Sequence, residues 1–342
     1  MVSRDGRCLP VDGRLDWTGQ GVPRMTRTLI VAAAQLGPIP RSQSRPEAVA
    51  RLIALMEEAR RMGAEMVVYP EAALTAFFPH WWIDDEAELE TWFEREMPNA
   101  AVQPLFDAAR RFGIGFKLGY CELDQSTGRK RRFNTAILVD RDGRIVGKYR
   151  KIHLPGTDQH RPEHPFQNLE KRYFEVGDLG FPVWETMGAR MGMMICNDRR
   201  WPESWRVLGL QGVELVMLGY NTPVHNPNTP ETDDLNNFHN HLSVQAGAYQ
   251  NGTWAVAVAK AGVEEGVDQI GQSCIVAPSG EIVAQASTLG DEIVVARCDL
   301  DRCAVYKQNI FNFARNRRTE HYGLIVERTG VGAPLGRPPG AG

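Results

Sequence analysis

The sequence predicts an α/β fold, a four-layer α-β-β-α sandwich in which two mixed sheets pack together with helices outside. Apolar runs alternate with segments of helical periodicity along most of the chain, as in βα units. The expected strands outnumber those of one parallel sheet with flanking helices, and several pair as hairpins. We expect one large domain, because no Ser/Gly-rich linker divides the middle of the 342 residues.

The expected elements of the first half follow from short apolar runs for strands and apolar residues three or four apart for helices. They are, in order, a strand at 28–34, a helix at 48–59, a strand at 66–69 stopped by Pro70, a helix at 104–112, a strand at 114–120, and a hairpin of 136–139 and 145–146 around the turn at 140–143. The Asp and Gly residues of that turn are typical of hairpin connections.

The second half shows the same alternation of strands and helices. Its expected elements are a strand at 191–195, a helix at 202–211, a strand at 213–218, a helix at 234–250, a strand at 254–259, and strands at 272–277 and 281–285 around the turn at 278–280. Together with the first half, these elements supply enough strands for two sheets.

Both ends of the chain are expected to lie outside the domain, which spans residues 25–327. Residues 1–24 are rich in Gly, Arg and Asp without periodicity, and we expect a disordered N-terminal extension there. The tail at 328–342 is rich in Gly and Pro. We expect it to be flexible, because it cannot bury enough apolar surface to offset the entropy of ordering.

The charge balance argues against nucleic acid or a membrane as a partner. Lys and Arg number 39 against 42 Asp and Glu, a net charge of -3, which offers no electrostatic footprint for nucleic acid or anionic lipid. No stretch approaches the roughly 18 apolar residues of a membrane span. The six cysteines are scattered and form neither a C-x-x-C pattern nor a dense disulfide framework. We therefore expect a cytoplasmic protein in a reducing compartment.

Cys196 is the most informative residue of the chain. It closes the apolar run 191–195 and precedes a predicted helix whose first turn holds Pro202 and Glu203. Amide N–H groups at that turn and the guanidinium groups of Arg199 and Arg200 are expected to favour the thiolate, the form of cysteine that acts as a nucleophile. From this stretch alone, an inert cysteine of the core is an equally good interpretation.

Two charged residues follow other predicted strands. Glu71 comes after the strand at 66–69, and Lys151 follows the hairpin that ends near 146. Functional groups at strand ends converge on one rim of an α/β sheet, so both side chains are expected near Cys196. Taken singly, Glu71 could cap a following turn and Lys151 could be a solvated cation at a sheet edge. Together, the three residues supply the base, cation and nucleophile that acyl transfer at sulfur needs.

With these residues the chain resembles the nitrilase superfamily of carbon–nitrogen hydrolases, whose triad is Glu, Lys and Cys. Within it, the chain is most similar to N-carbamoyl-D-amino acid hydrolases. The matching stretches are 132–135, 147–156, 169–174, 177–182, 196–206, 219–223 and 273–278. They lie within residues 26–327, nearly the whole of the predicted domain.

The resemblance implies a role for each residue of the site. Glu71 would be the general base, Lys151 the cation that stabilises the oxyanion, and Cys196 the nucleophile. Glu170 would contact the lysine and help to position substrate and water, although it could otherwise be an ordinary surface carboxylate. The backbone N–H of Asn197 would complete the oxyanion hole.

Four further residues are candidates for binding the substrate. Arg199 and Arg200 could hold a carboxylate, because guanidinium groups match it bidentately, although one of them could instead brace Glu203 or a neighbouring subunit. Asn221 and Thr222 resemble the substrate-side loop of the family. A passive surface loop is the alternative for them.

Two histidines and one departure complete the comparison with the family. His153 and His239 match histidines that carbamoylases use near the site, although a lone histidine is more often a packing residue. Where D-carbamoylases carry a histidine, two positions before the second glutamate, this chain has Asn168. Asparagine can donate a hydrogen bond but cannot titrate, so carboxylate binding or side-chain preference is expected to differ.

The predicted reaction is hydrolysis of an N-carbamoyl-D-amino acid to the D-amino acid, carbon dioxide and ammonia through a covalent Cys196 intermediate, with no metal and no cofactor. Another amidase or nitrilase of the superfamily, such as a β-ureidopropionase-like enzyme, is the alternative, and a catalytically silent binding protein is disfavoured because all three triad residues are present. A metal-dependent hydrolase is disfavoured because the histidines form no H-E-x-x-H pattern. The resemblance also implies a homo-oligomer, a dimer or tetramer, with residues 310–313 as a possible arm on the partner.

Overall fold

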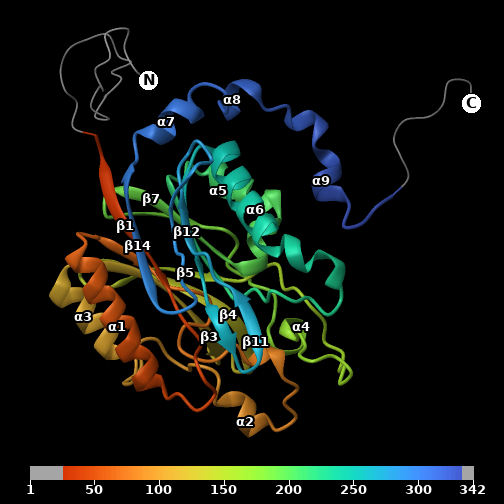
Figure 1. Cartoon of the computed structure of the whole chain (residues 1–342). Coiled ribbons are helices and arrows are strands. Elements are labelled where there is room, and N and C mark those ends of the chain that lie inside the picture. Colours follow the sequence, from red (N-terminus) through yellow and green to blue (C-terminus); the bar gives the residue numbers. More distant parts are fainter. Residues whose placement is uncertain (1–25, 333–342) are drawn as a thin grey trace, which may run out of the picture.

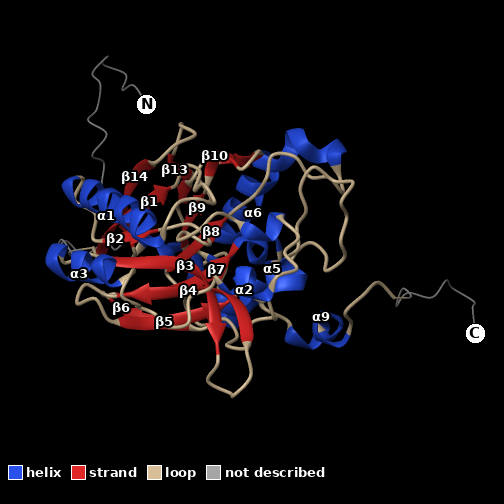
Figure 2. Cartoon of the chain, turned by 90° about the horizontal axis from the view of Figure 1, so that it is seen from below, coloured by secondary structure: helices blue, strands red, loops and turns tan. Residues whose placement is uncertain are grey.

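The computed structural model describes residues 26–332 and confirms the predicted fold class. Two six-stranded mixed sheets face each other, with α1 and α3 outside one sheet and α5 and α6 outside the other (Figure 1; Figure 2). The expected extension at 1–24 lies outside the described residues, as does the tail from 333 onward. Among the described residues, no helix combines the length and the apolar character needed to span a membrane.

The first sheet has three parallel strands, β1 to β3, extended by antiparallel neighbours on both sides. Its strands, in spatial order, are β14 (Glu292–Asp299), β1 (Thr28–Gln35), β2 (Met66–Val68), β3 (Gly115–Asp124), β4 (Arg131–Val139) and β5 (Ile145–Arg150). Since β4 is antiparallel to both β3 and β5, β5 runs in the same direction as β2. The chain leaves β2 and β5 at the same edge of this sheet.

The second sheet repeats this plan, with β7, β8 and β9 parallel at its centre. Its strands, in spatial order, are β13 (Ile282–Gln285), β12 (Cys274–Val276), β9 (Trp254–Ala259), β8 (Leu215–Tyr220), β7 (Ala189–Ile195) and β6 (Val183–Thr186). A separate hairpin, β10 (Ala261–Glu264) and β11 (Val267–Ile270), follows β9.

The helices cover the outer faces or connect the strands. The α-helices are α1 (Arg45–Arg61), α2 (Glu86–Glu90), α3 (Gln103–Phe112), α4 (Glu170–Tyr173), α5 (Pro202–Leu210), α6 (Asn236–Asn251), α7 (Arg302–Lys307), α8 (Phe313–Asn316) and α9 (Gly323–Glu327). Helix α1 shows why the sequence forms them: Ser44 and Glu47 build a capping box at its start, and Leu52, Leu55 and Met56 bury one face.

The largest core cluster lies between the two sheets. It joins residues of both sheets, among them Val31, Leu138, Met193 and Val256, all without exposed surface. The central strands are apolar on both faces, because one face meets the other sheet and the other face meets helices. This explains why these strands were recognisable in the sequence as continuous apolar runs.

The sequence-based boundaries were wrong where polar residues belong to strands. Strand β4 begins at Arg131, five residues before the predicted run, and β3 continues to Asp124. Its added residues pair with the start of β4 in a regular antiparallel ladder, which their polar side chains conceal. Strands β6, β10, β11 and β14 were not predicted. The helix expected from 234 begins at Asn236, after a 3-10 turn.

The chain after β14 arches over α5 and α6 (Figure 1). The predicted arm at 310–313 is part of this segment and lines, with α5 and α6 of the same chain, a cavity of about 700 Å³. An arm on a second copy of the chain remains a prediction.

Candidate active site

Glu71 lies just after β2 in a fully buried turn. Its Oε1 accepts hydrogen bonds from Asn134 Nδ2 at 2.7 Å and Lys151 Nζ at 2.8 Å. Its Oε2 accepts from the backbone N–H of Asn221 at 2.8 Å and from the Asn221 amide at 3.2 Å. Burial opposes ionisation of Glu71, but Lys151 and these donors outweigh it and hold the pKa below its ordinary value. Glu71 is therefore an anion at neutral pH.

Strand β8 approaches the turn of Glu71 closely, and a glycine of that strand makes this possible. A Cβ at Gly219 of β8 would lie 2.5 Å from the backbone nitrogen of Glu71 and 2.6 Å from Lys117 Nζ. Glycine at 219 lets the second sheet meet the turn without displacing the carboxylate.

Lys151 follows β5 and joins two carboxylates. Its Nζ donates to Glu71 Oε1 at 2.8 Å and to Glu170 Oε2 at 2.6 Å, and all three side chains are at most 1% exposed. Burial works against the ammonium form, but the negative charges around Lys151 raise its pKa. Burial raises the pKa of Glu170 above its ordinary value, with the Glu71 charge acting in the same direction. The structure thus brings together Glu71, Lys151 and Glu170, from three separate segments.

Cys196 occupies a tight turn between β7 and the 3-10 helix Cys196–Arg200. Its φ of 47° lies in the left-handed region, which is unusual for a residue with a side chain. A 3-10 turn that was not predicted spans Cys196–Arg200, and α5 then starts at Pro202, where the predicted helix begins. The Sγ lies 3.7 Å from the carbonyl oxygen of Asn221, the residue that also holds Glu71.

Asp198, which was not predicted as a site residue, stabilises this turn through hydrogen bonds. Its carboxylate accepts from the backbone N–H of Ile195 and of His153, both at 3.0 Å, and from the Tyr149 hydroxyl at 2.7 Å. His153 Nδ1 lies 2.9 Å from the same carboxylate, and the His153 ring stacks on Trp201. His153 therefore lies behind the turn and is absent from the pocket lining.

The prediction of a stabilised thiolate was wrong for the resting enzyme. Burial and the Glu71 charge raise the pKa of Cys196, and the opposing effects of Lys151 and Arg199 do not reverse this. The guanidinium group of Arg199 lies 3.8 Å from Sγ, but burial of the thiol and the Glu71 charge outweigh its effect on the pKa. The cysteine rests as a thiol, so a base would have to take its proton before sulfur could act as a nucleophile.

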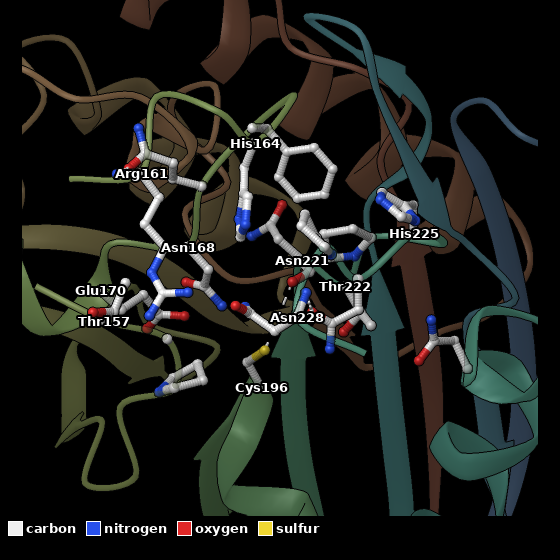
Figure 3. A pocket seen from close by; sticks show the side chains of 18 of the residues that line it. Thr157, Arg161, His164, Asn168, Glu170, Cys196, Asn221, Thr222, His225 and Asn228 are labelled. Atoms are coloured by element: carbon white, nitrogen blue, oxygen red, sulfur yellow. Dashed lines mark hydrogen bonds between the residues drawn. The ribbon is translucent and has the colours of Figure 1, made fainter. Parts of the chain in front are cut away.

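A solvent-accessible pocket of about 170 Å³ opens above the cysteine. Of the predicted site residues, the following line it: Glu170, Cys196, Arg200, Asn221 and Thr222. Figure 3 shows Cys196 at its floor, with Asn168 and Glu170 on one side and Thr222 and His225 on the other. The remaining lining comes from two loops, 155–168 and 221–228, and from Asn236.

The two arginines of the turn differ in position. Arg199 is 1% exposed and donates to the carbonyl oxygen of Cys196 at 2.7 Å and to Thr222 Oγ1 at 3.0 Å. Its guanidinium group also stacks over Tyr220. Arg200 instead is exposed and lines the pocket. The neighbouring Arg199 charge is the main cause that lowers the pKa of Arg200 to about 10. Of the pair, Arg200 is the one placed to meet a ligand.

Other predicted residues are not brought into the lining. The side-chain amide of Asn197 donates to the carbonyl oxygen of His153 at 3.2 Å. His239, on α6, packs beside Phe238 and is absent from the pocket. Asn168 does line the pocket, and its Oδ1 is buried without a hydrogen-bond partner. An unpartnered acceptor at that place fits a donor on a bound molecule.

Four residues near the site were missed from sequence. Asn134 holds Glu71, Asp198 holds the cysteine turn, Arg161 lines the pocket, and Lys117 lies beneath the turn of Glu71. Asn134 and Asp198 fall within stretches that matched the family, 132–135 and 196–206, and this match was the available signal. Within residues 26–332, no group of three His, Cys, Asp or Glu side chains is arranged to hold a metal ion.

Comparison with known proteins gives a consistent picture. A family model described as carbon–nitrogen hydrolase matches residues 30–308. The chain is 31% identical over 271 residues to a nitrilase of Pyrococcus abyssi, covering 78% of this chain and 90% of that protein. It is 29% identical over 288 residues to N-carbamoylputrescine amidase of Arabidopsis thaliana, covering 81% and 89%. It is 28% identical over 290 residues to citrullinase of Francisella tularensis, covering 82% and 93%.

Solved structures show the same fold. A carbon–nitrogen hydrolase from Helicobacter pylori G27 superposes with a TM-score of 0.74 at 23% identity, covering 88% of this chain and 99% of that one. An amidase from Nesterenkonia superposes with a TM-score of 0.65 at 21% identity, covering 88% and 97%.

Proposed function

Because this chain belongs to the carbon–nitrogen hydrolase family, we propose that it hydrolyses N-carbamoyl-D-amino acids to the D-amino acid, carbon dioxide and ammonia. The amidohydrolase class rests on the family. The carbamoyl amino acid and its D configuration rest on the resemblance of the motifs around Lys151, Glu170 and Cys196 to D-carbamoylases. Localisation in the cytoplasm and assembly into a homo-oligomer belong to the same proposal.

The observation that best supports this substrate is the charge of the pocket. Among the described lining residues, the cations are Arg161 and Arg200, and the one carboxylate is Glu170, which is already ion-paired with Lys151. A ligand that carries a carboxylate is attracted to such a pocket, and a ligand with a free ammonium is repelled. The pocket therefore favours a carbamoyl amino acid over N-carbamoylputrescine, the substrate named for several relatives.

The first half of the reaction uses the buried cluster. Glu71 takes the proton of the Cys196 thiol as sulfur attacks the carbamoyl carbon. The oxyanion that develops is stabilised by Lys151 and by the backbone N–H of Asn197. The intermediate then collapses with proton transfer from Glu71 to the terminal nitrogen, and ammonia leaves. The amino acid remains attached to sulfur through the carbonyl carbon of its former carbamoyl group, as a thiocarbamate.

The second half consumes one water. Glu71 removes a proton from the water, which attacks the thiocarbamate carbon, while Glu170 helps to position it. Sulfur leaves and regains its proton, and the released carbamate of the amino acid loses carbon dioxide to give the free amino acid. The sum is one carbamoyl amino acid and one water giving amino acid, carbon dioxide and ammonia.

We propose different supporting roles for the binding residues. Arg200 would hold the α-carboxylate at the pocket mouth. Arg199, buried behind the floor, would act through Thr222 and the Cys196 carbonyl rather than touch the substrate. The Asn221 amide would hold Glu71 in place.

Ammonia release from paired N-carbamoyl-D- and N-carbamoyl-L-amino acids tests the proposal, with N-carbamoylputrescine, a simple amide and a nitrile as competing substrates. We expect turnover of the D-carbamoyl compound and none in Cys196→Ala with a normal circular dichroism spectrum. Preference for N-carbamoylputrescine, the amide or the nitrile would assign another activity of the family. Failure of iodoacetamide to modify Cys196, together with no turnover, would indicate a silent binding protein.

A further inference from the structure

The loop at 155–168 brings a second cation into the pocket. Arg161 comes from this loop, far in the chain from Arg200, and Figure 3 shows it reaching toward Asn168, across the pocket from His225. One cation suffices for the α-carboxylate of an amino acid derivative. Arg161 is therefore available to bind a second anionic group of the ligand.

Hydrogen bonds and a ring contact hold Arg161 in place. Its backbone N–H donates to Gln167 Oε1 at 2.6 Å, and the Gln167 N–H donates to the carbonyl oxygen of His80 at 3.1 Å. At the tip of the loop, the His160 ring stacks on Trp82 with centroids 4.3 Å apart. The loop thus presents the guanidinium group from an anchored backbone rather than from a free surface segment.

No carboxylate of the described residues neutralises this guanidinium group. Of the acids nearest in sequence, Asp158 and Glu163 are exposed and neither forms an ion pair with Arg161, while Glu163 lies 3.9 Å from His164. Glu170 is engaged by Lys151 at 2.6 Å. An unpaired guanidinium that lines a pocket and also lacks a partner for its planar fork is a site for a carboxylate.

The other lining groups agree with a polar side chain on the substrate. Beside the catalytic residues and the two arginines, the lining carries amides, hydroxyls and the imidazoles of His164 and His225, and its apolar members are prolines and Phe166. Among the described lining residues there is no Leu, Ile, Val or Met against which an aliphatic side chain would pack.

We infer that Arg161 is a specificity-determining residue that binds a carboxylate on the substrate side chain, so that the enzyme prefers N-carbamoyl derivatives of acidic amino acids. This inference rests on the proposed function and deepens it. Arg200 holds the α-carboxylate and Arg161 the distal one, with the carbamoyl group directed at Cys196.

The test compares near-isosteric substrates that differ in charge. The kcat/KM of N-carbamoylglutamate and N-carbamoylglutamine, each as D and L forms, is measured for the wild type, Arg161→Gln and the control Lys171→Gln. Lys171 is exposed on α4 and absent from the pocket lining. A charge-assisted, bidentate hydrogen bond corresponds to about 10- to 100-fold in affinity.

We expect the wild type to favour the glutamate derivative at least tenfold, and Arg161→Gln to lose that preference because its kcat/KM falls at least tenfold more on the glutamate than on the glutamine derivative. Lys171→Gln should behave as the wild type. Equal use of both substrates by the wild type, or an equal loss for both in Arg161→Gln, would overturn the inference and leave the proposed function standing.

A binding measurement distinguishes failure of this inference from failure of the proposed function. Calorimetry in the Cys196→Ala background, with and without Arg161→Gln, reports the preference for the distal carboxylate without catalysis. Tighter binding of the glutamate derivative that depends on Arg161 supports the inference, and its absence contradicts it. If the wild type turns over no carbamoyl amino acid, the proposed function fails whatever the binding shows.

Discussion

Lys117 offers a direct test of how this fold tolerates buried charge. Its Nζ, without exposed surface, donates to the carbonyl oxygen of Tyr69 at 3.0 Å and lies 3.5 Å from that of Pro70, the two residues before Glu71. No described carboxylate pairs with it, in contrast to Lys151. We consider Lys117→Met, which keeps the length of the side chain and removes the amine.

The magnitude follows from the pKa. Burial lowers the pKa of Lys117 from 10.5 to about 7, with the Glu71 charge opposing only part of the effect. Because the folded-state pKa lies below that of the unfolded chain, the amine lowers the free energy of unfolding only where it is charged in the unfolded chain. This cost is nil above about pH 10.5. It grows as pH falls and levels off below about pH 7 at about 5 kcal/mol. Loss of the hydrogen bond to Tyr69 costs the variant about 1–3 kcal/mol at every pH.

Lys117→Met is therefore expected to be more stable than the wild type at pH 6.5, by about 2 kcal/mol or more. This advantage should shrink by about 1.4 kcal/mol per pH unit between pH 7 and 10. Urea unfolding at fixed protein concentration, at several pH values in that window, measures the difference.

Lys171→Met, at an exposed position, is the control, and its stability relative to the wild type should not change with pH. A difference between the wild type and Lys117→Met that stays constant from pH 6.5 to 9.5 would refute the argument. So would a variant that is the less stable protein at pH 6.5.

Three further changes probe the site. Lys151→Met leaves two buried carboxylates without their cation and should destabilise the folded protein by about 3–5 kcal/mol at pH 8. The loss should be smaller at pH 5, because protonation removes the carboxylate charges. An equal loss of stability at both pH values, measured by urea unfolding, would contradict this. Gly156→Ala places a Cβ 2.1 Å from the carbonyl oxygen of Asn168, at a φ of 74°. We therefore expect a lower melting temperature and a kcat/KM reduced at least tenfold. Wild-type values for both would show that the loop adapts to the added methyl group. Asp198→Asn removes the charge that accepts the hydrogen bond of the Ile195 N–H. Steady-state kinetics should show a fall in kcat with little change in KM. A change confined to KM would place Asp198 in substrate binding.

Apolar strands were predictable because they lie between two layers and need apolar side chains on both faces. Strand β8 illustrates this, since all six of its residues are buried. The polar start of β4 and the half-exposed strand β14, neither of which was predicted, carry no such constraint. Strand β14 pairs with β1, at the opposite end of the described chain, and no local pattern records such a partner.

The site was predictable as far as strand ends determine position. Glu71 and Lys151 each follow a strand of the first sheet, and their 2.8 Å contact results from the shared direction of β2 and β5. The residues that hold them were not predictable, because Asn134 lies within a strand and looks like any polar residue there. The direction of the thiol pKa also depends on burial, which the sequence does not give.

The raised pKa of the thiol has a consequence for catalysis. The cluster of Glu71, Glu170 and Lys151 already carries more carboxylates than cations, so a resting thiolate would add another negative charge near the buried Glu71. The negative charge becomes tolerable only when it moves onto a substrate oxygen that Lys151 can hold. Proton transfer to Glu71 and attack on carbon are therefore favourable together and unfavourable apart. In the proposed mechanism the substrate itself completes the electrostatics that would make Cys196 a nucleophile.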